Sequence, residues 1–238
     1  MALRRTTVSL DKGSAFTLSE DMLEEMLRTG AWREWCTGDL TSAVVNSGVV
    51  TDVTGLEHVE TGVTASSTAS LRTSNANTGF SVGQARTVID FGDRILIAIQ
   101  FTVDAGTTTG LLRVTIGKAT GIGVAELAVK GIGIRIANVT IGGHHYGTGA
   151  VNTAFDTGGL LVAAREYRVV VVSSNGRMEW FMDIGDGSGM VSRATATTGP
   201  TGLGTAGNCV MQIEAANGAD AVDTELSVHY LKTLVLPQ

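Results

Sequence analysis

The clearest pattern in the chain is the alternation of apolar and polar residues on both sides of Asn175-Gly176. An Asn-Gly pair adopts the two positive φ values of a type I′ turn at little steric cost, and this turn matches the twist of paired strands. The pattern therefore predicts a β-hairpin. The apolar residues expected on one face of it are Tyr167, Val169, Val171, Met178, Trp180, Met182 and Ile184.

From residue 43 onward, similar short runs are separated by Gly, Asn, Asp and Thr. The strongest is Arg94–Val103, whose strict alternation predicts a strand covered on one face and partly wet on the other. The run Glu225–Leu236 changes phase near Tyr230, which predicts a β-bulge there. The other predicted strands are 44–53, 56–63, 68–73, 85–91, 111–116, 122–129, 131–141 and 209–215. Many strands without alternating helices predict an antiparallel β-sandwich or jelly roll over residues 43–238.

Residues 1–42 follow a different pattern and are expected to form an N-terminal arm. Ser19 is a suitable N-cap, acidic residues fill the first turn after it, and Gly30 follows the last apolar residue, so the sequence predicts a helix at about 19–29. This helix must cover either the edge of the sandwich or a neighbouring chain. Its apolar stripe is Leu18, Met22, Leu23, Met26 and Leu27.

The arm also carries candidates for attachment to a partner. Trp32 and Trp35 either plug the end of the sandwich or anchor the arm on a partner, since exposed tryptophans are common hot spots of interfaces. Ahead of the helix, apolar and polar residues alternate as they would in an extended docking strand. The partner-binding residues expected in the arm are Leu3, Val8, Leu10, Met22, Met26, Trp32 and Trp35.

Composition and charge narrow the class of protein. The 31 glycines in 238 residues exceed the average share of about 7% and fit a turn-rich β protein. The net charge of −6 argues against a general affinity for nucleic acid or anionic membranes, because both need a positive field. The sequence contains no run of about 18 apolar residues, so it predicts no membrane-spanning helix. Polar residues interrupt the start of the chain where a signal peptide needs an apolar core, so we expect synthesis and folding in the cytoplasm.

Few residues suggest chemistry. His144, His145 and Tyr146 stand between glycines and are expected in a surface loop, where a turn or subunit contact is preferred over a metal site because no third ligand is suitably spaced. Asp183 and Asp186 are candidate calcium ligands, but their segment departs from EF-hand spacing and a plain hairpin connection is preferred. The sequence contains no nucleophile elbow, zinc motif or Walker loop, so we expect neither an enzyme nor a cofactor.

The order of the runs 94–103, 111–117, 133–138, 167–172 and 178–183 resembles the concanavalin A-like (lectin/glucanase, laminin G-like) jelly roll. In those domains a strand of the form Tyr-x-apolar-x-apolar leads through a short turn to a strand that ends in an aromatic residue and Asp. The glucanases of this group place their acids as Glu-x-Asp-x-x-Glu. Here Glu179 and Asp183 are spaced differently and lack the third acid, so the catalytic residues do not carry over and both acids are expected to be solvated.

Versions of this sandwich with a short arm, many Gly, Thr and Ala residues and few charges resemble virion proteins of tailed bacteriophages. The resemblance implies a non-enzymatic capsid decoration or fibre component in the virion, attached through its arm to other virion proteins and homo-oligomeric. The alternative is a lectin-like module that binds carbohydrate on a host surface. Aromatic residues make up only 5% of the chain, and Trp180, Phe101 and Tyr167 are expected in the core, which counts against stacking on sugars.

Overall fold

The architecture comes from a computed structural model. It describes residues 5–11, 14–19, 42–45, 48–53, 56–63, 66–72, 90–103, 110–117, 130–155, 161–184, 189–204, 210–217 and 223–236. These residues form strands and their connections, and among them no helix is long and apolar enough to cross a membrane. The expected antiparallel β-sandwich is confirmed.

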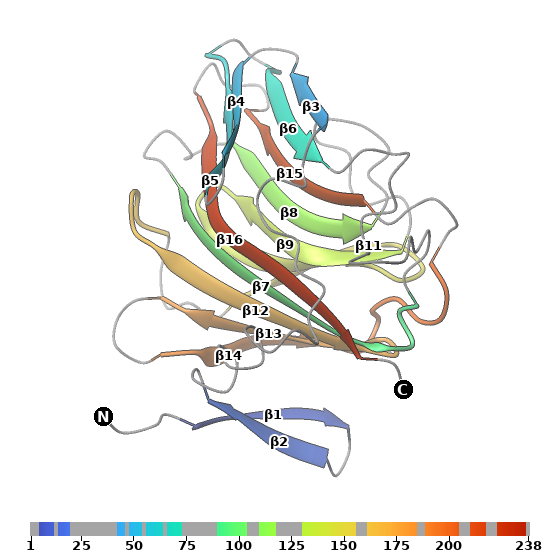
Figure 1. Ribbon diagram of the computed structural model, residues 1–238. Coiled ribbons are helices and arrows are strands. Elements are labelled where there is room, and N and C mark those ends of the chain that lie inside the picture. The colour runs from blue at the N-terminus through green and yellow to red at the C-terminus, as the bar shows by residue number, and fades with distance from the viewer. Residues whose placement is uncertain are drawn as a thin grey trace.

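Two antiparallel sheets, each with seven strands among the described residues, lie face to face (Figure 1). Sheet I has the order β14 (Val191–Ala196), β13 (Arg177–Asp183), β12 (Tyr167–Ser174), β7 (Arg94–Val103), β16 (Glu225–Leu236), β5 (Leu56–Thr61) and β4 (Gly48–Val53). Sheet II has the order β11 (Ala150–Ala154), β10 (Thr140–Tyr146), β9 (Gly131–Ala137), β8 (Leu111–Gly117), β15 (Val210–Ala216), β6 (Thr68–Arg72) and β3 (Ser42–Val45).

The core lies between the inner faces of the two sheets. Every second residue of the central strands points inward, and these side chains are almost wholly excluded from solvent. Sheet I contributes Ile95, Ile97, Ile99, Phe101, Val169 and Val171, and sheet II contributes Leu112, Val114, Ile116, Ile132, Ile134 and Ile213. This burial of apolar surface is the main driving force for the fold.

Trp180 connects the two sheets directly. Its side chain extends from β13 of sheet I and is fully buried, and its Nε1–H donates to the backbone oxygen of Gly133 on β9 of sheet II at 2.9 Å. The indole also lies against Gly143 on β10, where a Cβ atom would come within 2.3 Å of the ring. Phe155 and His145 complete its surroundings, with ring centroids 6.3 and 5.8 Å away.

The predicted hairpin and bulge are confirmed. Asn175 and Gly176 have φ values of 43° and 83°, as a type I′ turn requires. Two backbone hydrogen bonds connect the turn to the segment at Gly199 and Pro200. Gly176 N–H donates to Pro200 O at 3.1 Å, and Gly199 N–H donates to Gly176 O at 2.9 Å. The register of β16 shifts between Val228 and Tyr230, where the change of phase predicted a bulge.

Three strand predictions need correction. The expected strand 44–53 is two strands, β3 and β4, which belong to different sheets. The expected strand 131–141 is the hairpin β9–β10, which turns at Asn138 and Val139 with φ values of 51° and 54°. A valine at positive φ is uncommon, so the sequence carried no turn signal there. On β7 the outward-facing Leu96 and Ala98, expected on a partly wet face, are buried.

The pattern of apolar and polar residues does not predict the edge strands β11 and β14. Both are largely exposed and lack a regular apolar alternation. The expected strand 122–129 lies outside the described residues, and of 85–91 only Asp90 and Phe91 are described, with Asp90 forming an isolated bridge to Leu203.

The N-terminal segment contains a separate hairpin of β1 (Arg5–Asp11) and β2 (Ser14–Ser19). Residues 5–11 are therefore extended as expected, but they pair with β2 instead of forming a single docking strand. Leu18 lies in β2 and so does not belong to the helical stripe. The predicted helix beyond Ser19 lies outside the described residues, and the boundary of the arm near residue 42 stays a prediction.

The contact of Trp180 with sheet II predicts that two Gly→Ala substitutions differ greatly in their effect on the free energy of unfolding. Gly143→Ala places a Cβ against the indole and should lower the free energy of unfolding by about 1–3 kcal/mol, as overpacking does. Gly149→Ala is the control, because its Cβ would meet nothing within 4 Å, and it should change stability by less than about 0.5 kcal/mol. Urea denaturation measures both. Equal effects of the two substitutions would contradict the packing described here.

Candidate functional site

The outer face of sheet II carries polar side chains at alternate positions of its strands. On β8, for example, Arg113 and Thr115 point outward between the inward-facing Leu112 and Val114. Cross-strand pairing brings such positions into adjacent rows. We call this set the polar face; it consists of Ser70, Arg113, Thr115, Arg135, His144, Tyr146, Asn152, Gln212 and Glu214.

A charged network forms the centre of the polar face. Arg113 Nη2 donates to Glu214 Oε2 at 2.6 Å, and Gln212 Nε2 donates to the same oxygen at 3.1 Å. The arginine and glutamate side chains are only 5% and 3% exposed. Removal of either partner would leave a buried charge, so the pair is held firmly in place. Among the described residues, Gln212 Oε1 and Ser70 Oγ are buried without a hydrogen-bond partner.

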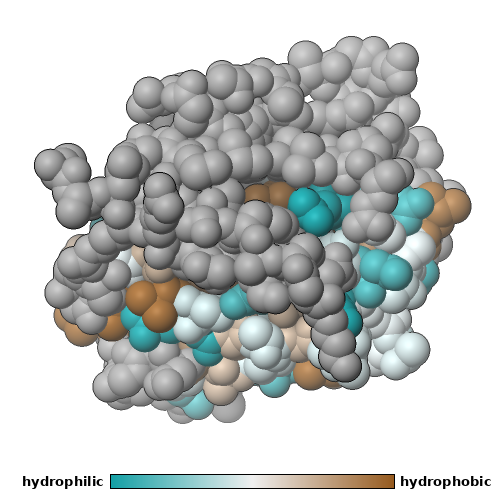
Figure 2. Space-filling view, turned by 90° about the horizontal axis from the view of Figure 1, so that it is seen from below, coloured by the Kyte–Doolittle hydropathy of each residue, from teal (hydrophilic) through white to brown (hydrophobic). Residues whose placement is uncertain are grey.

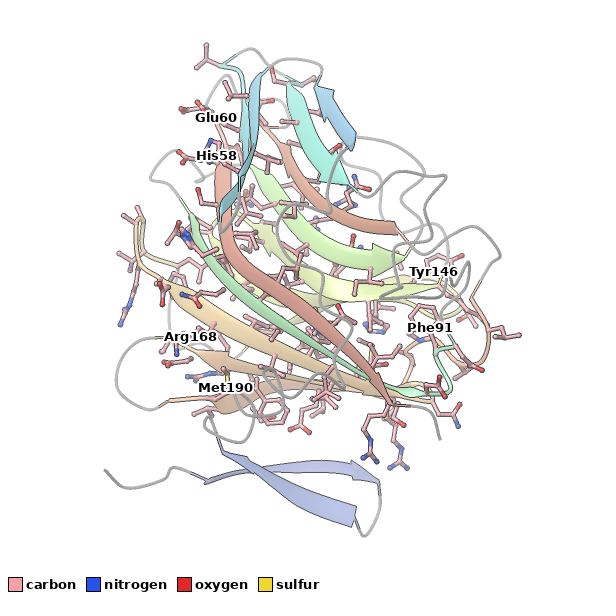
Figure 3. The ribbon with its side chains drawn as sticks, viewed as in Figure 1. His58, Glu60, Phe91, Tyr146, Arg168 and Met190 are labelled. Atoms are coloured by element: carbon pink, nitrogen blue, oxygen red, sulfur yellow. The ribbon has the colours of Figure 1, made fainter. Side chains whose placement is uncertain are left out.

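The polar face becomes accessible at the β9–β11 end. His144 Nδ1 donates to Asn152 Oδ1 at 2.7 Å, and since an amide oxygen only accepts, this bond fixes the proton on Nδ1. His144 is buried, Asn152 is exposed, and Tyr146 and Arg135 are half-buried. Figure 3 shows Tyr146 at the opposite side of the view from His58 and Glu60. This end therefore offers solvent a phenol, an amide and a guanidinium around one ordered imidazole.

Glycines, which have no side chain, lie between these polar residues on the outer face of sheet II. Gly133 is the cross-strand neighbour of His144, and its added Cβ would meet Val114 O at 2.1 Å. Gly142 is the neighbour of Arg135, and its Cβ would meet Thr153 O at 2.8 Å. Both positions thus need glycine because neighbouring strands approach closely.

The expectation of a surface loop at His144, His145 and Tyr146 is wrong. All three lie in strand β10, and both histidines are fully buried. The flanking glycines indicated a loop, but they are required by sheet packing instead. Because successive residues of a strand point to opposite faces, the structure separates the two imidazoles and brings only His144 and Tyr146 to the polar face.

His145 points into the core beside Trp180. One ring nitrogen, Nε2, lies 3.1 Å from Thr198 Oγ1, while Nδ1 is buried without a hydrogen-bond partner among the described residues. Burial lowers the pKa of His145 below its ordinary value of 6.5 because desolvation disfavours the charged ring. His145 is therefore a neutral core residue.

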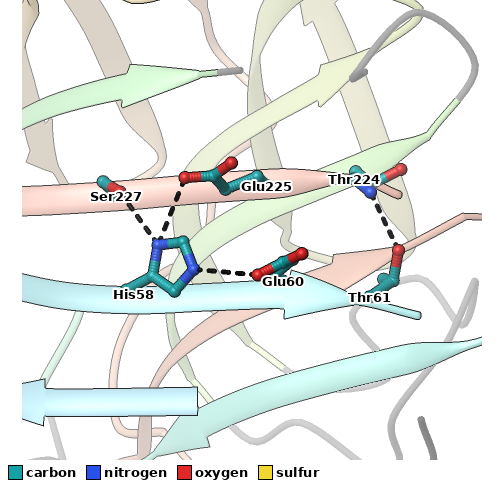
Figure 4. A network of polar contacts seen from close by, with 6 residues as sticks. All are labelled: His58, Glu60, Thr61, Thr224, Glu225 and Ser227. Carbon is teal, nitrogen blue, oxygen red and sulfur yellow. Dashed lines mark hydrogen bonds and ion pairs between the residues drawn. The ribbon is translucent and has the colours of Figure 1, made fainter. Parts of the chain in front are cut away.

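A second polar cluster lies on the outer face of sheet I, around His58 (Figure 4). Its Nε2 is 3.5 Å from Glu60 Oε2, and its Nδ1 is 3.5 Å from Glu225 Oε1 and 3.0 Å from Ser227 Oγ. The two carboxylates face different ring nitrogens, and no group of three His, Cys, Asp or Glu among the described residues could hold a metal ion. These half-exposed contacts link β5 to β16.

The acids on β13 are placed differently from the expectation. Glu179 is buried, not solvated, and its Oε1 accepts a hydrogen bond from Ser192 Oγ at 2.5 Å. Desolvation by burial raises its pKa, and the bond from Ser192 opposes that shift. Asp183 ends β13 and is half-buried, while Asp186 lies outside the described residues.

The partner-binding residues expected in the arm stay predictions. Val8 and Leu10 lie in β1, and the others lie outside the described residues; these are Leu3, Met22, Met26, Trp32 and Trp35. Sequence reasoning also missed the charged network of Arg113, Gln212 and Glu214. The available signal was the presence of polar residues at alternate positions inside two otherwise apolar strands.

No family model matches the chain, and no curated protein matches it. Solved structures match in fold. The exoplasmic/lumenal domain of VIP36 in its Ca²⁺-bound form has a TM-score of 0.54 at 12% identity, over 87% of this chain and 89% of that one. Its Ca²⁺/Man3GlcNAc-bound form has a TM-score of 0.54 at 14% identity, over 84% and 85%. The protein SO2946 of unknown function from Shewanella oneidensis MR-1 has a TM-score of 0.53 at 13% identity, over 84% and 77%.

At these identities the likeness shows the fold alone. The sandwich is a jelly roll of the concanavalin A-like type, as the sequence resemblance implied. Function must then be argued from the residues of the polar face.

The buried neutral His145 predicts a specific loss of stability in acid. Its folded pKa lies below the unfolded value of about 6.5, so stability should fall as the pH drops from that value through the folded pKa. His145→Gln should remove this part of the pH dependence, because Gln does not titrate. Unfolding free energies of both proteins between pH 8 and pH 5 test this. Parallel curves over that range would contradict it.

Proposed function

We propose that this protein is a carbohydrate-binding domain and that the accessible end of the polar face, at β9–β11, holds the ligand. The observation that carries the proposal is the His144–Asn152 pair beside the half-buried Tyr146. A sugar presents many hydroxyl groups, each of which both donates and accepts. The exposed amide of Asn152, held by His144, and the phenol of Tyr146 supply both kinds of partner.

Preorganisation supports this site. The bond from His144 holds the Asn152 amide in one orientation, so less conformational entropy is lost when a ligand binds. The strands behind it are fixed by the contact of Trp180 with Gly133. Half-buried polar groups on a rigid sheet are a suitable starting point for recognition of a polar ligand.

The fold similarity supports the same proposal. Of the two matching VIP36 structures, one is the Ca²⁺-bound form and the other is the Ca²⁺/Man3GlcNAc-bound form. The shared fold does not by itself transfer the ligand, but it indicates which sugars to test first. An oligomannose series is therefore the first set of sugars to test.

We further propose binding without cleavage. Glycoside hydrolysis generally needs two carboxyl groups flanking the scissile bond. On the described part of the polar face Glu214 is the one carboxylate, and it accepts bonds from Arg113 and Gln212. A paired carboxylate that is only 3% exposed, without a second carboxyl group beside it on the described part of this face, does not supply the arrangement that this reaction needs.

The virion role expected from the sequence stays a prediction. The described residues offer no observation that bears on a capsid or tail. Carbohydrate binding, the alternative function that the sequence indicates, has the support of both the polar face and the fold.

A glycan array followed by calorimetry tests the proposal. We expect binding of at least one oligosaccharide, and Asn152→Ala and Tyr146→Ala should each weaken it by about tenfold or more, because each removes hydrogen bonds at the site. His58→Ala on sheet I is the matched control and should leave affinity unchanged. The array is run with calcium and with EDTA, because Asp183 stays a candidate ligand.

Two outcomes would contradict the proposal. One is the absence of any signal on a broad array with the folded protein. The other is binding that survives both substitutions on β10 and β11 but is lost in His58→Ala.

A further inference from the structure

The strands of the candidate site carry positive charge in a chain that is acidic as a whole. The chain has a formal net charge of −6. Strands β8, β9, β10 and β11, which are neighbours in sheet II, contain the arginines Arg113 and Arg135 but neither Asp nor Glu. The side of the molecule in Figure 2, from below the view of Figure 1, shows hydrophobic and hydrophilic described residues interspersed and indicates no single class of ligand.

One row of cross-strand partners on the polar face shows how these charges are arranged. From β15 to β9 the row consists of Glu214, Arg113 and Arg135. It continues on β10 and β11 with Gly142 and Ala154. Among these described residues there are two guanidinium groups and one carboxylate, so the row carries an excess of one positive charge.

The carboxylate lies at the far side of this row from the candidate site. Glu214 Oε2 accepts a hydrogen bond from Arg113 Nη2 at 2.6 Å, and both side chains are buried. Arg135 stands on the other side of Arg113 and is half-buried. Like charges directly opposite each other on neighbouring strands are destabilising, so an anion bound beside Arg135 would stabilise the pair of arginines.

Arg135 lies one row from the pair His144–Asn152. Neighbouring strands are about 4.8 Å apart, and positions two residues apart along a strand are separated by about 7 Å. Gly142 is the cross-strand partner of Arg135, and Gly133 is that of His144. No side chain of β9 or β10 therefore stands between Arg135 and the imidazole. A ligand held at Asn152 lies within reach of the guanidinium.

A second cation lies at the Tyr146 end of the site. Lys130 directly precedes Gly131, the cross-strand partner of Tyr146. The Nζ of Lys130 donates to the backbone oxygens of Thr201 and Leu203, which carry no net charge, so these bonds leave the positive charge of the ammonium in place. The candidate site thus has a cationic side chain on each side, which favours an anionic ligand.

We propose that the ligand of this site is an acidic glycan and that Arg135 binds the carboxylate of one of its sugars. The planar guanidinium matches a carboxylate with two parallel hydrogen bonds, whereas the sugar hydroxyl groups remain for Asn152 and Tyr146. This inference rests on the proposed carbohydrate site and names the class of sugar that it takes.

Calorimetry with matched pairs of ligands tests the inference. Oligomers of galacturonic, glucuronic and mannuronic acid are each measured as the free acid and as the methyl ester, which keeps the hydroxyl groups and removes the charge. The unchanged protein should bind at least one free acid about tenfold or more tightly than its ester, because hydrogen bonds between charged groups are the stronger ones. The difference should shrink between about 0.05 and 0.5 M NaCl, because salt screens accessible charges.

Two substitutions separate the carboxylate contact from the rest of the site. Arg135→Gln should remove the preference for the free acid and leave the affinity for the ester unchanged, whereas Asn152→Ala should weaken the binding of both ligands. Arg168→Gln on sheet I is the matched control, because it makes the same change of charge at a half-exposed arginine, and it should keep the preference. Melting curves check that each variant is folded.

The outcomes distinguish this inference from the proposed function. Esters and neutral sugars that bind as tightly as the free acids, or a preference for the acid that persists in Arg135→Gln, would overturn the assignment of an acidic ligand to Arg135 while carbohydrate binding stands. If no sugar of either kind binds the folded protein, the proposed function fails and the inference fails with it.

Discussion

The side chain of Trp180 connects the two sheets and favours one position of each relative to the other. The rest of the structure depends on this contact. Its indole leaves sheet I, crosses the core and donates a hydrogen bond to Gly133 O on sheet II. A buried donor without an acceptor would cost about 1–3 kcal/mol, so this bond favours one position of β9 relative to β13. The requirement for glycine at position 143, against the ring, restricts β10 in the same way.

The candidate site follows from that constraint. Strands β9 and β10, which the indole holds from inside, carry Arg135, His144 and Tyr146 on their outer side. Alternation along a strand means that the residues in contact with Trp180 and the residues of the polar face are immediate neighbours in sequence. His145 packs beside the indole, while His144 bonds Asn152 on the opposite face. Core packing thus positions the polar groups proposed to bind a ligand.

The outer faces of sheet I and sheet II differ in polarity. The outer face of sheet II is polar, whereas part of the outer face of sheet I is apolar and buried, and β1 contacts two strands of that sheet, β12 and β13. A strand that is covered on both faces has a nearly continuous run of apolar residues in its sequence, as β12 has from Val169 to Val172. The apolar runs in β7 and β12 therefore indicate strand segments that are covered on both faces.

Most of the fold was predictable because its signals are local. The Asn175-Gly176 turn, the alternation on β7 and the phase change near Tyr230 each depend on adjacent residues. The candidate site was not predictable in this way. Arg113 and Glu214 are 101 residues apart and meet only through strand pairing, and the glycines around β10 resemble loop residues although packing requires them. The turn at Asn138-Val139 was hidden by a valine in an uncommon conformation.

The most direct test of the central claim, that the accessible end of the polar face at β9–β11 holds the ligand, is amide hydrogen exchange of the full chain. It is measured by mass spectrometry with and without a saturating concentration of the sugar that binds best. The account predicts slower exchange in β10 and β11 on binding, with β4 and β5 of sheet I unchanged. Protection confined to sheet I, or no change in β10 and β11 at saturation, would contradict it.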